Sequence, residues 1–150
     1  MRAVVQRVLE AAVHISGAEH AAIGTGLLVL LGIETGDTED DLAWLCGKVA
    51  RMRLFPDVDG VMNLDINEAR GELLLVSQFT LHASTRKGNR PSYIRAARPE
   101  EAIPLYLRAK QLFSTLVHGH VRSGEFGANM QVSLVNDGPV TMVIDSKLKE

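Results

Sequence analysis

A continuous apolar run at residues 26–33, written GLLVLLGI, constrains the fold more than any other feature of this chain. A strand with one face in water alternates apolar and polar residues, whereas an unbroken apolar run indicates a strand that is covered on both faces. A second run, ELLLV at residues 72–76, has the same character. Together the two runs predict a sheet whose centre is buried between two layers.

Further apolar runs predict the rest of the sheet, and apolar residues at helical spacing predict two main helices. The helices are expected at 38–52, where acidic residues open the first turn, and at 99–117, where Pro99 stands near the start. Strands are expected at 2–8, 11–15, 26–33, 73–80, 121–125, 130–136 and 140–145, with a short one at 19–23. The predicted fold is α/β, with a single domain over residues 1–150 and a mostly antiparallel, barrel-like sheet covered by two main helices.

Charge and aromatic content narrow the possible partners. The net charge is −2, so the chain is not a general polyanion binder, and aromatic residues are only 5%, which argues against a stacking surface for many bases. The single cysteine, Cys46, lies in an apolar helical stretch and is expected in the core, and no internal disulfide can form. With no signal-peptide pattern and no apolar run long enough to span a bilayer, a cytoplasmic location is expected.

The hexapeptide NDGPVT at residues 136–141 lies between two apolar-rich runs. Asparagine, aspartate, glycine and proline all favour turns, so from these residues alone a hairpin turn is the favoured interpretation. The alternative is a ligand-binding segment, because Gly138 lets a ligand approach the backbone closely and Pro139 stiffens the chain. In that case the main-chain carbonyl groups would carry the polarity of the site.

Polar side chains follow the second apolar run, where Ser77, Gln78 and Thr80 flank Phe79. Burying such groups without partners is costly, so one interpretation places them at the mouth of a binding site. The other is that Ser77 and Thr80 only cap the end of the strand.

Residues 84–98 contain five basic residues and no acidic one. The basic residues are Arg86, Lys87, Arg90, Arg95 and Arg98. In a chain of net charge −2 this asymmetry favours an anionic partner such as a phosphate backbone, and a solvated surface loop is the alternative.

No metal or cofactor site is predicted. His118 and His120 have no third ligand at a suitable spacing, so they are expected to be exposed turn residues. The aspartates at 57, 59 and 65 do not have the spacing of a calcium-binding loop, and the glycines at 24–26 do not form a phosphate-binding loop.

Two of these stretches together resemble the signature motifs of D-aminoacyl-tRNA deacylases. The motifs are VSQFTL at residues 76–81 and VNDGPVT at residues 135–141. The resemblance covers nearly the whole chain, and it includes MRAVVQRV at 1–8, GLLVLLG at 26–32, TRKGNRPS at 85–92 and MQVSL at 130–134. The presence of both motifs, in this order and at a fitting separation, is highly specific to this family.

The resemblance implies a cytoplasmic homodimer that hydrolyses the ester between a D-amino acid and the terminal adenosine of tRNA, and that also removes glycine from mischarged tRNA. It further implies that the Gly138–Pro139 bond is cis and that this step reaches into the pocket of the partner subunit. Its paired carbonyl groups would hold the α-amino group and leave no room for an L side chain. Arg7 is expected to brace this segment by donating hydrogen bonds to its carbonyl groups.

The resemblance places the chemistry at Ser77, Gln78, Phe79 and Thr80. Thr80 is a candidate nucleophile by residue type, but a threonine needs a base, and His82 would point away from it on an extended strand. The hypothesis adopted is RNA-assisted: the terminal 2′-hydroxyl group helps to activate water, and main-chain N–H groups near Phe79 and Thr80 form an oxyanion hole.

Binding roles follow from the same resemblance. Phe126 and Met130 are expected to be walls for the terminal adenine. The acceptor stem of tRNA is expected at Arg86, Lys87 and Arg90. Two residues depart from the commoner family pattern, Asn129 where aspartate is expected and Glu125 where arginine is expected.

Three other function classes remain as alternatives. A non-catalytic RNA-binding module would keep the basic segment but cleave no ester. An ordinary threonine or serine hydrolase would act on small esters that lack RNA. A structural dimer would use the Gly-Pro segment only to brace its interface.

Overall fold

The first strand, β1 (Arg2–Ile15), organises the sheet in the computed structural model, which describes residues 1–149. Its first half pairs antiparallel with β3 (Gly26–Gly32), and its second half pairs antiparallel with β2 (Ala18–Ile23). Along its other edge, β1 pairs antiparallel with β8 (Met130–Asp145). The sheet continues from β3 through two parallel neighbours, β6 (Glu72–Ser77) and then β7 (Val121–Ser123).

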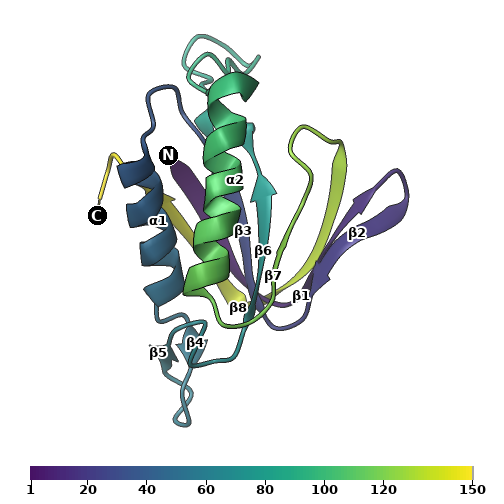
Figure 1. Ribbon diagram of the computed structural model, residues 1–150, viewed down its shortest axis with the longest axis vertical. Coiled ribbons are helices and arrows are strands. Elements are labelled where there is room, and N and C mark those ends of the chain that lie inside the picture. Colours follow the sequence, from purple (N-terminus) through teal and green to yellow (C-terminus); the bar gives the residue numbers. More distant parts are fainter. Residues whose placement is uncertain (150) are drawn as a thin grey trace.

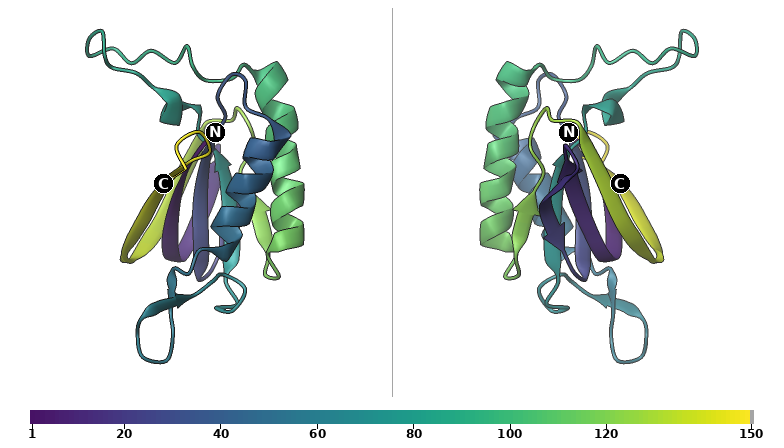
Figure 2. Two further views of the ribbon diagram at one scale, coloured as in Figure 1. Left: turned by 90° about the vertical axis from the view of Figure 1, so that its left-hand side faces the viewer. Right: turned by 90° about the vertical axis from the view of Figure 1, so that its right-hand side faces the viewer.

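The sheet curves into a nearly closed barrel, because β1 pairs with two strands in succession along one edge and β2 also contacts β6 and β7. Figures 1 and 2 show α1 (Glu39–Arg51) and α2 (Pro99–Leu116) side by side on the same side of this sheet. A small hairpin of β4 (Phe55–Pro56) and β5 (Met62–Leu64) extends from one end of the molecule. The predicted α/β fold, with a mostly antiparallel, barrel-like sheet and two main helices, is confirmed.

Local signals in the sequence explain where the helices begin. Thr38 caps α1: its hydroxyl group accepts a hydrogen bond from the backbone N–H of Asp41, whose carboxylate accepts one from the N–H of Thr38. Pro99 stands in the first turn of α2. Backbone N–H groups in this turn have no partner within the helix, so a proline, which lacks the N–H, costs no hydrogen bond there. No helix among residues 1–149 is both long and apolar enough to cross a membrane.

The central strands are buried on both faces, as the apolar runs predict. On β3, Leu27, Val29 and Leu31 belong to the core beneath the helices, whereas Leu28 belongs to a second core inside the curved sheet. The residues of β6 divide in the same alternating way. Cys46 is fully buried in the core beneath the helices, and burial raises the pKa of its thiol to about 12, so it is a packing residue and not a nucleophile.

Several expected strand boundaries are wrong. The ranges 2–8 and 11–15 form the single strand β1, and the ranges 130–136 and 140–145 form the single strand β8. The strand expected at 73–80 ends at Ser77, because a 3₁₀-helix, η1 (Phe79–His82), replaces its last residues, and the strand expected at 121–125 ends at Ser123. Local apolar pattern locates strands, but the pairing partner decides where each one ends.

Candidate functional site

A cavity of about 290 Å³ opens where β6 ends, next to η1, the start of α2 and the start of β8. Five of the predicted site residues line it together: Ser77, Gln78, Phe79, Phe126 and Met130. The rest of its wall is mostly apolar and includes Leu31, Ile33, Val76, Ala97, Ala102, Ala128 and Val132. Of the two departures from the family pattern, Asn129 lines the cavity, and Glu125 is exposed and does not.

A buried tyrosine holds one wall of the cavity in place. The hydroxyl group of Tyr106, on α2, donates to the carbonyl oxygen of Leu75 (3.1 Å), and its ring packs on Phe126 with centroids 5.6 Å apart. Burial raises the pKa of Tyr106 to about 12, so the hydroxyl group stays a donor at neutral pH. Sequence reasoning missed Tyr106, although tyrosine in an apolar helical stripe is a signal for a buried ring with a polar partner.

The 3₁₀-helix η1 presents main-chain N–H groups beside the cavity. Within residues 1–149 the N–H groups of Phe79 and Thr80 have no hydrogen-bond acceptor, as expected for the first residues of a helix. The Thr80 hydroxyl group accepts a hydrogen bond from Nε2 of Gln78, and Thr80 does not line the cavity.

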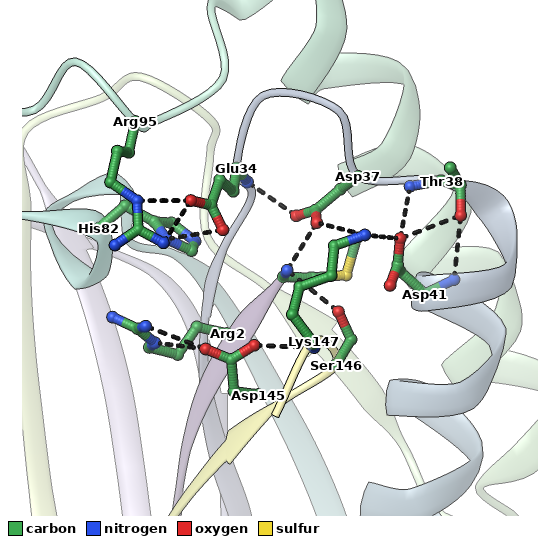
Figure 3. A network of polar contacts seen from close by, with 11 residues as sticks. Arg2, Glu34, Asp37, Thr38, Asp41, His82, Arg95, Asp145, Ser146 and Lys147 are labelled. Carbon is green, nitrogen blue, oxygen red and sulfur yellow. Dashed lines mark hydrogen bonds and ion pairs between the residues drawn. The ribbon is translucent and has the colours of Figure 1, made fainter. Parts of the chain in front are cut away.

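The expectation that His82 lies on an extended strand is wrong, because residues 79–82 are helical. His82 is buried, with Nδ1 3.8 Å from Oε2 of Glu34, and neither ring nitrogen is in a hydrogen bond with any of residues 1–149. Glu34 also pairs with Arg95 (Figure 3). The imidazole therefore faces Glu34 and is not a base for Thr80.

Arg2 ties η1 to the sheet. Nη1 of Arg2, on β1, donates to the carbonyl oxygen of Leu81 (2.7 Å), while Nη2 of Arg2 pairs with Asp145 of β8 (2.9 Å). Figure 3 shows the pair of Arg2 and Asp145 near Glu34, Arg95 and His82. The position of η1 thus depends on β1 and β8 as well as on β6, which precedes it.

The hexapeptide at 136–141 is a bulge inside β8, and its interpretation as a hairpin turn is wrong. Asn136 pairs with Val8 and Thr141 with Gln6, so residues 137–140 lie opposite Arg7 alone. The Gly138–Pro139 bond is cis, as the resemblance implies, and both residues are exposed. Neither lines the cavity, so within one chain this segment and the first motif form separate sites.

Two side chains hold the bulge. Nδ2 of Asn136 donates to the carbonyl oxygens of Arg7 (2.9 Å) and Val140 (3.0 Å) and so bridges its two ends. Nη1 of Arg7 donates to the carbonyl oxygen of Leu54 (2.6 Å), and its Nε lies 2.9 Å from Oδ2 of Asp137 without hydrogen-bond geometry. Arg7 therefore contacts the segment through the carboxylate of Asp137, and within residues 1–149 it does not donate to the carbonyl groups of the Gly-Pro step.

The role of Asn136 was missed from the sequence, because asparagine before Asp-Gly is also a common turn residue. Only the pairing of β8 with β1 reveals that its side chain spans the bulge.

The basic segment forms a loop that extends away from the body of the molecule (Figure 2). Paired main-chain hydrogen bonds between Ser84 and Ser92 (2.8 and 2.9 Å) close it into a hairpin. Arg86, Lys87 and Arg90 lie on this hairpin and are exposed, but they do not line the cavity.

The amino-acid sequence of this chain is similar to those of known proteins. The family model described as D-Tyr-tRNA(Tyr) deacylase matches residues 4–145. A D-aminoacyl-tRNA deacylase of Akkermansia muciniphila is 63% identical over 150 residues, which is 100% of both chains. One of Porphyromonas gingivalis is 57% identical, again over 100% of both chains.

The chain is also similar to solved structures. The c-Myc DNA Unwinding Element Binding Protein superposes with a TM-score of 0.92 at 38% identity, over 97% of this chain and 98% of that chain. A structure described as "a probable eukaryotic D-amino acid tRNA deacylase" has a TM-score of 0.78 at 16% identity, over 95% and 97% of the two chains, and shares the fold. From the sequence and structural matches together, the chain belongs to the D-Tyr-tRNA(Tyr) deacylase family.

Proposed function

We propose that this chain acts in the cytoplasm as a homodimer that hydrolyses the ester between a D-amino acid, or glycine, and the terminal adenosine of tRNA. The observation that carries the proposal is the convergence of the first signature motif with Phe126 and Met130 on one cavity. Family membership over residues 4–145 supports the D-aminoacyl-tRNA deacylase activity, which makes the protein a hydrolase.

In this proposal the cavity holds the terminal adenosine, with Phe126 and Met130 as walls for the base. An apolar cavity with a few polar groups at its mouth suits such a ligand. The Tyr106 ring keeps Phe126 in position, so the wall is formed before substrate binds.

The stereochemical filter is the Gly138–Pro139 step, contributed by the partner subunit. Its exposure and its separation from the cavity of its own chain support this assignment, because the segment is free to enter a second copy. Its main-chain carbonyl groups accept hydrogen bonds from the α-amino group and leave no space for an L side chain. Glycine has no side chain to exclude, so its ester is also accepted.

The chemical step uses RNA and main-chain groups. An aminoacyl ester is already activated, so positioning and stabilisation of the developing oxyanion are sufficient. The N–H groups of Phe79 and Thr80, which have no acceptor among residues 1–149, suit the oxyanion. The 2′-hydroxyl group of the terminal ribose helps to activate the attacking water.

The hairpin residues Arg86, Lys87 and Arg90 contact phosphates of the acceptor stem. Their exposure, and the absence of acidic residues between 84 and 98, support such contacts, which are salt-dependent and largely independent of base sequence.

Paired deacylation assays with D-Tyr-tRNA and L-Tyr-tRNA test the proposal. The wild-type protein should cleave the D ester rapidly and spare the L ester. Gly138→Ala should either accept the L ester or lose activity, because the new Cβ would lie 2.8 Å from Cγ2 of Val140 and 3.0 Å from Nη2 of Arg7, at a φ of +119°. Its free energy of unfolding should fall by about 1–3 kcal/mol.

Gly36→Ala is the matched control. Gly36 has a φ of +83°, but apart from its chain neighbours no atom of residues 1–149 lies within 4 Å of the point where its Cβ would stand. The variant should lose stability from its backbone conformation and keep its preference for the D ester. If the wild-type protein binds tRNA but cleaves neither ester, the catalytic proposal is wrong and an RNA-binding module is the better conclusion.

A further inference from the structure

The exposed aromatic rings of this chain lie in contact with each other. All aromatic residues fall within the described part of the chain, and only Phe79 and Tyr93 are exposed, by 54% and 40%. Their ring centroids are 5.1 Å apart and the rings meet edge to face, at 71°. An edge-to-face contact leaves ring faces open, and an open aromatic face can stack on a base.

The pair lies between the cavity and the basic hairpin. Phe79 lines the cavity. Tyr93 directly follows Ser92, whose main-chain bonds to Ser84 close the hairpin that carries Arg86, Lys87 and Arg90. A single strand whose last nucleotide enters the cavity would therefore pass the aromatic pair before its phosphates reach the hairpin.

We propose that Phe79 and Tyr93 form a stacking platform for the unpaired base of the nucleotide that precedes the terminal adenosine. The inference rests on the proposed function, since the terminal nucleotide must occupy the cavity. It adds a binding site for a second nucleotide, with Tyr93 as the residue specific to that site.

The chemistry around the pair favours a nucleotide. Stacking tolerates any base, because every base has a flat π-face, and the neighbouring phosphates suit a segment with basic residues but no acidic one. An aromatic content of only 5% suits stacking on a single base and not on many.

Steady-state deacylation of D-aminoacyl-tRNA by Tyr93→Leu, Tyr93→Phe and Ile94→Ala tests this platform. Tyr93→Leu should lower kcat/KM about tenfold, mainly through KM, because it removes the ring face. Tyr93→Phe keeps the ring and should recover most of the loss. Ile94 is 87% exposed and has no aromatic ring, so Ile94→Ala is the matched control and should behave like wild type.

A substrate that lacks the base of the preceding nucleotide separates stacking from a structural effect. Wild-type protein should lose about tenfold in kcat/KM on this abasic substrate, and Tyr93→Leu should lose nothing further, because the two changes remove the same interaction. A loss in Tyr93→Leu that is as large on the abasic substrate as on the intact one would overturn the platform, as would no loss on either.

The failure of the proposed function would look different. In that case the wild-type protein would cleave neither the intact nor the abasic D ester, and the platform would be overturned together with it. Thermal unfolding of the three variants completes the comparison, because a stacking loss leaves the melting temperature unchanged.

Discussion

The hydroxyl group of Thr80 lies beside the cavity lining, and among residues 1–149 no basic group contacts it. The hydroxyl oxygen accepts a hydrogen bond from Gln78, and the nearby His82 is buried against Glu34. A threonine nucleophile needs a base to take its proton, and an amide group cannot do so. The geometry therefore favours main-chain catalysis over a covalent intermediate on Thr80.

Thr80→Ala should retain activity within about tenfold of wild type, since within residues 1–149 the one hydrogen bond that the hydroxyl group makes is with Gln78. Single-turnover deacylation of a D ester measures this directly. Thr80→Ser is the control, because it keeps the hydroxyl group. If the serine variant is active and the folded alanine variant is dead, Thr80 is the nucleophile and the RNA-assisted mechanism is wrong.

At the scale of elements, the first turn of α1 is tied to the segment that follows β8. Asp41 completes the capping box with Thr38 and pairs with Nζ of Lys147, which follows β8 (2.6 Å; Figure 3). Burial alone would raise the pKa of Asp41, but hydrogen bonds from Lys147, Thr38 and Ser146 outweigh it and hold the pKa well below its ordinary value. The charged carboxylate therefore stabilises the fold above the pKa of about 4 that aspartate has in an unfolded chain.

Asp41→Asn should lower the free energy of unfolding by about 1–2 kcal/mol at pH 7. The pKa is depressed in the folded state, so the stabilisation is lost as pH falls from about 5 towards the folded pKa. The difference in free energy of unfolding between wild type and Asp41→Asn should therefore shrink as the pH is lowered from 7 to 3, as measured by urea unfolding.

Asp40→Asn serves as the comparison, because Asp40 is also in the first turn of α1 but is exposed. Its effect on the free energy of unfolding at pH 7 should be smaller, because Asp40 is exposed. A constant difference between wild type and Asp41→Asn down to pH 3 would contradict the role given to the carboxylate.

At the scale of the whole molecule, one chain carries both signature motifs but does not bring them together. The cavity holds the first motif, whereas Gly138 and Pro139 are exposed elsewhere on β8. If the partner supplies the second motif, each active site needs two chains. A two-fold dimer would then contain two equivalent shared sites.

Heterodimers purified through two different tags test this arrangement. One chain carries Gly138→Leu, which disrupts the segment, and the other carries Ala128→Trp, which fills the cavity from its bordering loop. With shared sites, the unaltered cavity receives the unaltered segment, and about half of the wild-type activity should remain.

The control places both changes on one chain beside a wild-type partner. Shared sites then predict almost no activity, because the intact cavity receives the altered segment. If each site belonged to one chain, the two results would be reversed, so the pair of assays distinguishes the arrangements.

Much of the candidate site could be predicted from the sequence, because its signals are local. Polar residues after a buried strand pointed to Ser77, Gln78 and Thr80, and of these Ser77 and Gln78 line the cavity whereas Thr80 does not. The resemblance of the two motifs added Phe126 and Met130. Asn136, Tyr106 and Tyr93 were missed as site residues, because their contacts join segments far apart in the chain.

The sequence by itself determined the fold class, the two helices and the presence of two doubly buried strands at the apolar runs 26–33 and 72–76. Apolar periodicity and helix caps act within a few residues, so they can be recognised without a structure. Only the tertiary structure decided that residues 136–141 are a bulge within β8 and that residues 79–82 leave the strand as a helix. Those outcomes depend on the pairing of β8 with β1 and on the packing of η1 against β3, which join residues that are distant in sequence.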